Sequence, residues 1–440
     1  MALKKKAQFI NFDLTSNNTV AIQAAKNLAS QLTLGDRLLP LKLGFILCLL
    51  FNLKRGYAYK RNIIIPQDKE FYRKNKNNSR PKYQTYDIVV GVIKELESKG
   101  YIKYQGHVIK FATSEYYPER SLLPYFSGYS MNDVTVFPPT KNVILRKLAE
   151  ETDDYDGAKK YVDIDYYPTQ LTQIMSRDLF IYNRLREYSS VSLKDLPSYI
   201  FNKHIDEFLS RWSVDDVEAI RYTKASTVTL ELQKSYLVRI FNLNFRRGGR
   251  FYRGVESNMP EELRRHVHID SNPTVELDYS GHHLRMLYHL KKIDLKTDPY
   301  AVEPNMTPGM RDVYKTVSLI GINAKSNKSA LLALYQKFEE DDDLAKCLPD
   351  NSHATRQKLI NNFKTHNKRI AEHLFKQKCH QLMNLDSKIS NDILMFFAKK
   401  RILVLCIHDS YIIEKQYAKE LLKVMRNAYR ARLGFNPVIK

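Results

Sequence analysis

Apolar residues recur at helical spacing in the N-terminal part of the chain. The residues of this stripe are Tyr86, Val89, Val90, Ile93 and Leu96. Their spacing predicts a helix with one buried face, and Gly100 follows as a C-terminal capping residue. Beyond it, residues 101–104 and 107–111 are rich in aromatic and β-branched residues and flank a Gln105-Gly106 turn. The segment therefore predicts a helix, a strand, a turn and a second strand.

A helix followed by a short two-stranded ribbon is typical of a winged-helix module. A basic, turn-rich stretch of the kind that tracks phosphates precedes the helix. Its cationic residues are Lys69, Arg73, Lys74, Lys76, Arg80 and Lys82. We interpret residues 1–130 as a winged-helix-like nucleic-acid-binding module, with Arg73, Lys74 and Lys76 as candidate contacts. The alternative is a small structural α/β module with a solvated, charged loop.

The middle of the chain, residues 131–240, shows no motif of its own. Residues 171–188 and 195–212 have helix-like apolar spacing, interrupted only by Pro197 near the start of the second segment. We therefore expect this part to be mostly helical and to connect the N-terminal module to the rest of the chain. The candidate chemistry lies in residues 241–440.

Two acidic residues in this last part each follow a strand-like run. Residues 273–277 are β-rich and lead into Asp278, after which residues 281–290 have a helix-like pattern. Residues 401–407 form a nearly unbroken aliphatic run, which is typical of a strand buried on both faces. This run leads through His408 to Asp409. The pattern therefore places two carboxylates at the ends of two buried strands.

A carboxylate beside a buried strand is costly unless it is paired or binds a metal ion. Two carboxylates on neighbouring strands repel each other, and a pair of divalent ions is the usual compensation. In such a site one ion activates an attacking hydroxyl, and the other holds a triphosphate and its leaving group. Asp278 and Asp409 are therefore candidate ligands of two metal ions. The alternative for each residue alone is a cap or turn role.

The segment between the two carboxylates supplies candidate phosphate ligands. Thr307-Pro308 is a helix-start signal, with Thr307 as the N-cap and Pro308 in the first position. Arg311 and Lys315 follow four residues apart and therefore project from one face of this helix. A guanidinium and an ammonium on one face suit a triphosphate. The alternative is an ordinary exposed basic helix.

The net charge is the most informative feature of the composition. Hydrophobic residues make up 43% of the 440 residues, which is enough for two or three domains with cores of their own. Lysine and arginine outnumber aspartate and glutamate 70 to 48, so the formal net charge is +22. Such a surplus favours a polyanionic partner, because bound phosphates release condensed counterions. We expect nucleic acid as that partner, and the alternative is a ribosomal or merely soluble basic protein.

The sequence argues against membrane association. The longest apolar run, residues 38–51, is interrupted by Pro40 and Lys42 and is too short to span a bilayer. The basic N-terminal sequence lacks the apolar core of a secretory signal. The four cysteines are scattered without a CxxC pair, so neither a zinc site nor a disulfide framework is expected. A reducing, cytoplasmic setting fits this pattern.

Four segments together resemble a known polymerase family. Residues 278–290, Asp-Tyr-Ser-Gly-His-His-Leu-Arg-Met-Leu-Tyr-His-Leu, resemble motif A of the A-family DNA polymerases, typified by bacterial DNA polymerase I. The four-residue spacing of Arg311, Lys315, Leu319 and Asn323 is similar to motif B. His408-Asp409-Ser410 resembles motif C, and its serine is nearer to the phage-type single-subunit RNA polymerases, whose palm is related. Gly248-Gly249-Arg250-Phe251-Tyr252 is similar to the glycine–arginine motif that contacts the template–primer backbone in both groups.

The resemblance covers roughly residues 245–415 and implies a fold and a metal. The fold would be α+β: a right-hand polymerase with an antiparallel palm sheet and helical fingers and thumb. Residues 241–440 would hold the palm and fingers, and residues 131–240 a helical thumb or connector. Asp278 and Asp409 would bind two Mg²⁺ ions, with the backbone carbonyl of Tyr279 completing one coordination sphere.

The resemblance also assigns partners to the remaining residues. The implied partners are nucleoside triphosphates and a DNA template–primer, with RNA as an alternative. Arg311 and Lys315 would hold the triphosphate, and Lys315 would neutralise its charge or protonate the leaving pyrophosphate. Leu319 and Asn323 would extend this face toward the nucleotide base. Arg250 would hold the template or primer backbone, and His408 would position the primer terminus.

Two positions depart from the family pattern. His283 stands where the DNA polymerases usually carry a glutamate that crowds the 2′ carbon of the sugar, and Asn323-Ala324 stands where motif B usually ends in Tyr-Gly. A bulky His283 under the sugar favours deoxynucleotides, so we expect a DNA polymerase of a phage or mobile element. No exonuclease-like carboxylate set is evident, so we expect no proofreading. The alternatives are an RNA polymerase or primase on the same palm, and a DNA-binding replication factor with an inactive palm. The oligomeric state stays open.

Overall fold

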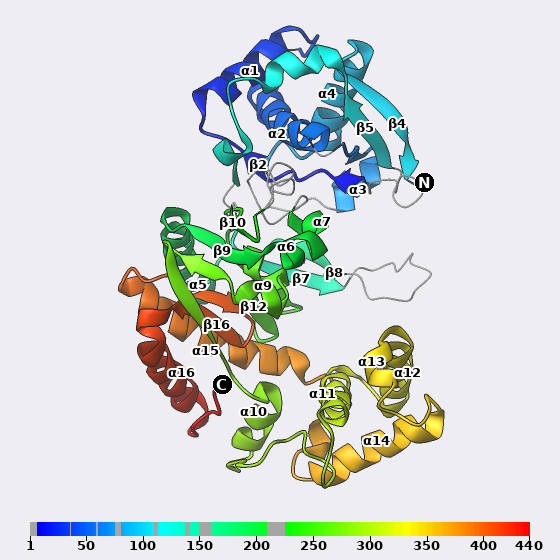
Figure 1. The fold of residues 1–440 in the computed structure, drawn as a ribbon, viewed down its shortest axis with the longest axis vertical. Helices are drawn as coiled ribbons and strands as arrows, with labels where there is room; N and C mark the ends of the chain where they lie inside the picture. The colour runs from blue at the N-terminus through cyan, green and yellow to red at the C-terminus, as the bar shows by residue number, and fades with distance from the viewer. Residues whose placement is uncertain are drawn as a thin grey trace. The chain divides into compact units, whose positions relative to one another are not determined.

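The chain divides into two compact units. Figure 1 shows their helices and strands, coloured along the chain. The computed structural model describes residues 7–35, 37–58, 60–74, 81–108, 113–136, 141–148, 161–208 and 225–440. Unit 1 comprises Met1–Arg239 and Tyr252–Thr274, and unit 2 comprises Ile240–Phe251 and Val275–Lys440. Helices and largely antiparallel sheets occur along the chain, so the expected α+β class is confirmed.

The N-terminal part of unit 1 combines helices with a four-stranded sheet in the order β1-β3-β5-β4. β1 and β3 are parallel, and the other neighbouring strands are antiparallel. The sheet strands are β1 (Gln8–Phe9), β3 (Ile63–Pro66), β4 (Ile102–Val108) and β5 (Thr113–Pro118). The helices are α1 (Thr19–Ser30), α2 (Leu39–Ala58), α3 (Lys69–Lys74) and α4 (Tyr86–Ser98). A separate ribbon pairs β2 (Leu14–Thr15) with β6 (Thr135–Val136).

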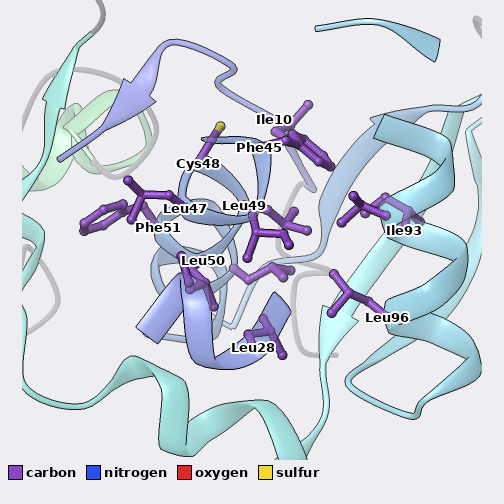
Figure 2. Packing of buried hydrophobic residues seen from close by; sticks show 14 of the residues in the cluster. Ile10, Leu28, Phe45, Leu47, Cys48, Leu49, Leu50, Phe51, Ile93 and Leu96 are labelled. Atoms are coloured by element: carbon purple, nitrogen blue, oxygen red, sulfur yellow. The ribbon is translucent and has the colours of Figure 1, made fainter. Parts of the chain in front are cut away.

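Helix α2 forms the centre of this core. Its residues from Phe45 to Leu53 are buried on every side of the helix, and Figure 2 shows Ile93 and Leu96 of α4 among the side chains of this cluster. A helix that is apolar all round is buried in a core or spans a membrane, and here the apolar run is a core helix. Along the described ranges, no helix is long and apolar enough to cross a bilayer.

The predicted helix, strand and strand are present as α4, β4 and β5, but the predicted turn is wrong. Strand β4 continues through Gln105-Gly106 to Val108. The pairing with β5 shifts register between Tyr104 and Gly106, and Gly106 has φ 140°. A β-bulge therefore takes up the extra residue where we expected the chain to reverse. The residues that join the two strands, 109–112, lie outside the described part of the chain.

The winged-helix interpretation stays a prediction. The helix before the ribbon of such a module meets DNA through its exposed face. The charged side chains on the exposed face of α4 are Asp87, Lys94 and Glu97. This face carries two carboxylates and one ammonium, and it therefore lacks the positive charge that phosphate contacts require.

The middle of the chain differs from the expected, mostly helical connector. Helix α5 (Gln170–Tyr188) matches the first predicted helix. The second predicted helix is wrong in its first part, because strand β9 extends to Pro197 and only the short helices α6 and α7 follow before residue 208. The elements after β6 are β7 (Val143–Leu148), β8 (Tyr161–Ile164), β9 (Val191–Pro197), α6 (Ser198–Lys203), α7 (Ile205–Glu207), β10 (Thr227–Glu231) and β11 (Val238–Asn242).

The physical reason for this difference is strand pairing over long sequence distances. In unit 1, β9 lies between β10 and β13 (Val267–Ile269) and is antiparallel to both. Leu193 and Leu196 of β9 are completely buried in this sheet. Burial against strands from distant segments overrides the helix-like spacing of the local sequence. The short helix α9 (Glu261–Arg264) precedes β13.

Unit 2 contains three neighbouring strands in the order β14-β16-β15, packed with helices α10, α15 and α16. Helices α11 to α14 pack with one another. The strands are β12 (Gly248–Tyr252), β14 (Asn272–Asp278), β15 (Leu405–Ile407) and β16 (Ser410–Glu414), of which β12 and β14 each have one end in unit 1. The helices are α10 (His282–Leu290), α11 (Pro308–Asn323), α12 (Asn327–Glu340), α13 (Asp342–Ala345), α14 (His353–His366), α15 (Cys379–Lys399) and α16 (Ala418–Leu433).

Local signals predicted some of these boundaries. Strand β14 ends at Asp278, and α11 begins at Pro308 with the Thr307 hydroxyl accepting from the N–H of Met310 at 3.2 Å. Strand β15 is shorter than the predicted run 401–407, although Leu403 and Val404 before it are buried.

Two glycines allow the chain to reach Arg250. Gly248 and Gly249 have φ values of 77° and 91°, which L side chains rarely adopt. A Cβ atom on Gly249 would lie 2.3 Å from the ring of Phe241. The glycines of this segment therefore serve backbone conformation and close packing beside the arginine.

We expect Gly249→Ala to lower the free energy of unfolding by about 2–3 kcal/mol, because it combines a strained φ with overpacking against Phe241. Chemical denaturation of the full chain measures this loss. Gly91→Ala is the control: Gly91 is in α4, and nothing lies within 4 Å of its added Cβ. That change should be neutral or raise stability by up to about 1 kcal/mol. Equal effects of the two substitutions would contradict the packing argument.

Candidate active site

Asp278 and Asp409 belong to adjacent strand ends in unit 2. Asp278 is the last residue of β14. Asp409 lies in the two-residue turn between β15 and β16, where Ile407 pairs with Ser410 and His408 has φ 58°. The N–H of Tyr279 donates to the carbonyl of Asp409 at 3.2 Å. This bond joins the end of β14 directly to the turn that carries the second carboxylate.

The two carboxylates interact through their charges. Burial, and then the charge of Asp409, raise the pKa of Asp278 to about 7. Glu276 raises this pKa further, whereas Lys315 acts in the opposite direction. Burial and the neighbouring carboxylates thus disfavour the charged form of Asp278, and an added cation would favour it.

Glu276 is a member of this cluster that the sequence analysis missed. It lies two residues before Asp278, and side chains two apart point to the same face of a strand. Its carboxylate accepts a hydrogen bond from the Ser410 hydroxyl at 2.6 Å. This alternation is the sequence signal that could have identified Glu276. The contact also gives the serine of the His-Asp-Ser motif a structural role.

A short segment at residues 438–440 fixes the backbone of Asp278. The N–H of Asp278 donates to the Lys440 carbonyl and the N–H of Lys440 donates to the Asp278 carbonyl, both at 2.9 Å. The N–H of Ser280 donates to the Val438 carbonyl, also at 2.9 Å. Because bonding groups alternate in direction along an extended chain, the N–H and C=O of Tyr279 point the other way, toward the β15–β16 turn.

This arrangement fits the Mg²⁺ ligands that the family resemblance implies. The carboxylates of Asp278 and Asp409 and the carbonyl of Tyr279 supply hard oxygen ligands at one place. Among the described residues, no group of three or more His, Cys, Asp or Glu side chains has the arrangement of a metal site. Mg²⁺ needs only one or two carboxylates, because it keeps several waters and binds substrate phosphates.

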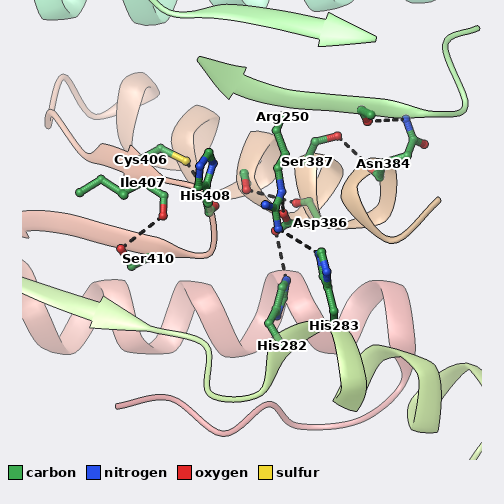
Figure 3. A network of polar contacts seen from close by, with 12 residues as sticks. Arg250, His282, His283, Asn384, Asp386, Ser387, Cys406, Ile407, His408 and Ser410 are labelled. Carbon is green, nitrogen blue, oxygen red and sulfur yellow. Dashed lines mark hydrogen bonds and ion pairs between the residues drawn. The ribbon is translucent and has the colours of Figure 1, made fainter. Parts of the chain in front are cut away.

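A buried charge network lies beside the carboxylates (Figure 3). Its centre is Asp386 of α15, which is fully buried. Arg250 Nε donates to Asp386 Oδ2 at 2.6 Å, and His282 Nε2 donates to Asp386 Oδ1 at 3.1 Å. Arg250 Nη2 donates to His283 Nε2 at 2.9 Å. Asp386 was not among the candidates from sequence, although it is the one acidic residue on the buried face of α15.

The network fixes the charge states of its members. Burial opposes the charge of Asp386, but the Arg250 guanidinium and the His282 hydrogen bond hold its pKa well below the usual range. Burial and the charge of Arg250 lower the pKa of His283 to about 3. The His283 ring is therefore neutral at ordinary pH, with Nε2 as the acceptor.

Arg250 is consequently anchored in the protein interior. Its side chain is 12% exposed, and two of its nitrogens are bound to Asp386 and His283. Burial, and then Arg250, lower the pKa of His408, so His408 lies within reach of the same charge. The structure thus brings Arg250, His283 and His408 together. The predicted contacts of Arg250 and His408 with template or primer stay predictions.

The two candidate phosphate ligands of α11 differ in their surroundings. Arg311 Nε donates to Asp298 Oδ2 at 2.6 Å, so its charge is already paired. Lys315 is exposed, and none of the ion pairs found in the described part of the chain involves it. Leu319 is 60% exposed on the same helix. The side-chain amide of Asn323 donates to the Leu319 carbonyl at 2.8 Å, so Asn323 is tied to its own helix.

Tyr300 is a further residue of this region that the sequence analysis did not identify. It lies in the loop between α10 and α11, and the Arg311 guanidinium lies over its ring at 5.1 Å from the centroid. Burial, and then Asp409, raise the pKa of Tyr300 to about 12. Its hydroxyl therefore lies in the field of the carboxylate pair and remains protonated.

The candidate phosphate contacts of the N-terminal module belong to unit 1. Arg73 is exposed and pairs with Glu70 at 2.8 Å on α3. Lys74 is the last residue of this six-residue helix, and Lys76 lies outside the described residues.

Comparisons with known proteins identify no relative. No protein-family model matches the chain, and no curated protein matches it.

We expect Asp386→Asn to lower the free energy of unfolding by about 3–5 kcal/mol, because it leaves the buried charge of Arg250 without its anion. The matched control is Asp392→Asn on the same helix. Asp392 pairs with Arg432 at 2.7 and 2.8 Å at the surface, so its loss should cost less than about 1 kcal/mol. Chemical denaturation compares the two variants, and similar losses would contradict the central role of Asp386.

Proposed function

We propose that this chain is a template-directed DNA polymerase that joins nucleotides by two-metal phosphoryl transfer. The observation that carries the proposal is the pair of carboxylates at the end of β14 and in the β15–β16 turn, where burial and Asp409 raise the pKa of Asp278 to about 7. Lys315 is exposed, and its charge acts on Asp278. It therefore supplies a cation for a triphosphate beside the carboxylates. The order of the four resembling segments supports the same function.

Each residue of the site has a role in this mechanism. Two Mg²⁺ ions bound by Asp278, Asp409 and the Tyr279 carbonyl would activate the primer 3′-hydroxyl and stabilise charge on the leaving pyrophosphate. Lys315 neutralises the triphosphate as a mobile point charge. Arg311 is held by Asp298, so it contributes a fixed positive potential beside the triphosphate. The exposed side chain of Leu319 offers an apolar surface for the nucleotide base.

The neutral His283 ring explains the proposed choice of sugar. Arg250 holds the ring through Nε2, so the imidazole cannot easily rotate away from a nucleotide bound over it. A 2′-hydroxyl meeting this fixed ring would displace the sugar, and misplacement by about 1 Å can cost about a hundredfold in rate. The proposal therefore includes deoxynucleotides as substrates.

The partners and setting in this proposal follow from charge and cysteine chemistry. The net charge of +22 suits DNA. The four cysteines are free thiols, which fits the reducing interior of a cell and a cytoplasmic location. The proposal includes the N-terminal module as a DNA-binding element that binds through cations such as Arg73 and Lys74 of α3 and not through the exposed face of α4.

An RNA polymerase or primase is the alternative that the serine of the His-Asp-Ser motif favoured. In the structure the Ser410 hydroxyl is buried and donates to Glu276. This contact within the protein explains the serine. The serine is therefore no argument for ribonucleotides over deoxynucleotides. Incorporation assays with dNTPs and with NTPs, each with and without a primer, separate a DNA polymerase from an RNA polymerase or primase. An inactive palm would show no incorporation with either.

We expect Asp278→Asn and Asp409→Asn each to reduce incorporation at least about a thousandfold, since loss of a metal ligand removes several kcal/mol of transition-state stabilisation. The melting temperature should stay unchanged or rise, because each change removes charge repulsion between the carboxylates. DNA affinity should also persist. Primer extension, thermal melting and DNA binding on the same preparation test this pattern, with Asp392→Asn as control. Near-normal turnover in either variant would reject the two-metal assignment.

We expect His283→Ala to raise the NTP-to-dNTP ratio of kcat/KM by tenfold or more, up to about a hundredfold, because it removes the ring that crowds the 2′ position. His283→Gln is the matched control, since a side-chain oxygen can still accept from Arg250. The glutamine variant should retain more total activity than the alanine variant. Asn323→Ala should change the ratio less, because its amide is tied to Leu319. A wild type that already prefers NTPs would contradict the proposed sugar choice.

A further inference from the structure

Helix α16 carries a row of cations on its outward face. The four residues of this cationic stripe are Lys419, Lys423, Arg426 and Arg430, and all are exposed. Spacings of four, three and four residues place them on one side of the helix. With a rise of about 1.5 Å per residue, the stripe extends over roughly 16 Å. It is therefore a straight, narrow band of positive charge.

The stripe differs from its surroundings because its charges are not paired. Across the described parts of the chain, no ion pair or side-chain hydrogen bond is found for any of its four residues. Two neighbouring cations are paired: Lys400 of the α15 end with Glu420, and Arg432 with Asp392. Anions thus border the stripe at its sides and are missing along it.

This arrangement works against the stability of the helix. Like charges three and four residues apart repel each other on a helix surface. Lys419 also lies in the first turn, where the positive end of the helix dipole disfavours a cation, whereas Arg430 lies in the last turn, where the dipole favours one. Solubility does not require such a row, because the chain already has a large net charge. A polyanionic partner would relieve this repulsion.

The stripe faces away from the candidate active site. The opposite side of α16 is buried and includes Leu421, Met425 and Tyr429. On that side the ring of Tyr429 lies 5.6 Å from the ring of Tyr279, the residue after Asp278. Helix α16 packs against α15, and Figure 1 shows the two together in unit 2. The stripe is therefore a surface separate from the carboxylate pair.

We propose that the cationic stripe of α16 binds the phosphate backbone of duplex DNA, independently of base sequence and outside the active site. Proteins that hold single strands add exposed aromatic rings for base stacking, and α16 exposes none, since Tyr429 is buried. Helices that lie in a membrane surface expose large apolar side chains, and α16 exposes none of these either. What remains on this face is phosphate-directed charge. The inference does not rest on catalysis.

The test compares two variants that lose the same charge. The stripe variant combines Lys419→Gln, Lys423→Gln, Arg426→Gln and Arg430→Gln. The control variant combines Lys292→Gln, Lys358→Gln, Lys368→Gln and Lys376→Gln, which are exposed lysines scattered over unit 2. Affinity for a blunt duplex without a primer terminus is measured against salt concentration. The stripe variant should lose about three to four units of the log–log salt slope and at least about tenfold in affinity near 0.1 M salt. The control variant should lose one unit or less.

Further measurements make each outcome decisive. The stripe variant should melt no lower than wild type and should incorporate nucleotides normally on saturating primer–template. If it melts lower, the double variant Lys423→Gln/Arg426→Gln should still lose about two units of slope. An unchanged slope, or an equal loss in the control variant, overturns the proposal. So does stripe-dependent binding to vesicles of anionic lipid with duplex binding intact. A wild type that incorporates nothing but shows the slope difference rejects the proposed function alone.

Discussion

The ion pair between Asp386 and Arg250 connects segments that are more than a hundred residues apart in the chain. Asp386 of α15 receives hydrogen bonds from Arg250 of β12 and from His282 at the start of α10. The His282 ring stacks on Tyr279 at 4.7 Å, next to Asp278. Burial and the Arg250 guanidinium that Asp386 holds keep His283 neutral, although the charge of Asp386 itself opposes this. A single buried carboxylate thus positions Arg250 and His282 beside the candidate site. The carboxylate pair depends on it for a rigid surrounding, because a buried, fully bonded network has few alternative arrangements.

Local signals in the sequence were sufficient for some parts of this site. Thr307-Pro308 marks the start of α11 because capping depends on adjacent residues, and the apolar runs before Asp278 and Asp409 mark strand ends for the same reason. Asp386, Tyr300 and the segment 438–440 could not be found in this way, because their importance comes from contacts with distant segments. The helix predicted for residues 195–197 was wrong for the same reason, because contacts with distant segments decide the structure there. The spacing there was ambiguous, and pairing with β10 and β13 decided the structure. The wrong turn at Gln105-Gly106 shows that a glycine signal does not distinguish a bulge from a reversal.

The structure also separates two residues that the sequence treats as equivalent. Arg311 and Lys315 lie on one face of α11, but Asp298 holds the first and leaves the second exposed. A fixed cation and a mobile one differ in what they can do for a phosphate: the first contributes a constant potential, and the second can follow a moving charge. Asp298, which lies outside α11, therefore makes the two cations of this helix different. Pairing also distinguishes cations elsewhere in unit 2. Lys400 and Arg432 beside α16 are paired with carboxylates, whereas the cationic stripe of α16 has no anions of its own.

The turn that carries Asp409 has a consequence for how such a chain can diverge. Only two residues separate the paired positions Ile407 and Ser410, so the turn has no length to spare. One inserted residue would rotate the following strand by one position and turn its side chains to the opposite face. A change of length between β15 and β16 would therefore keep the register only if a bulge absorbed it, as one does in β4, and replacement of single side chains is the variation that leaves the site unchanged.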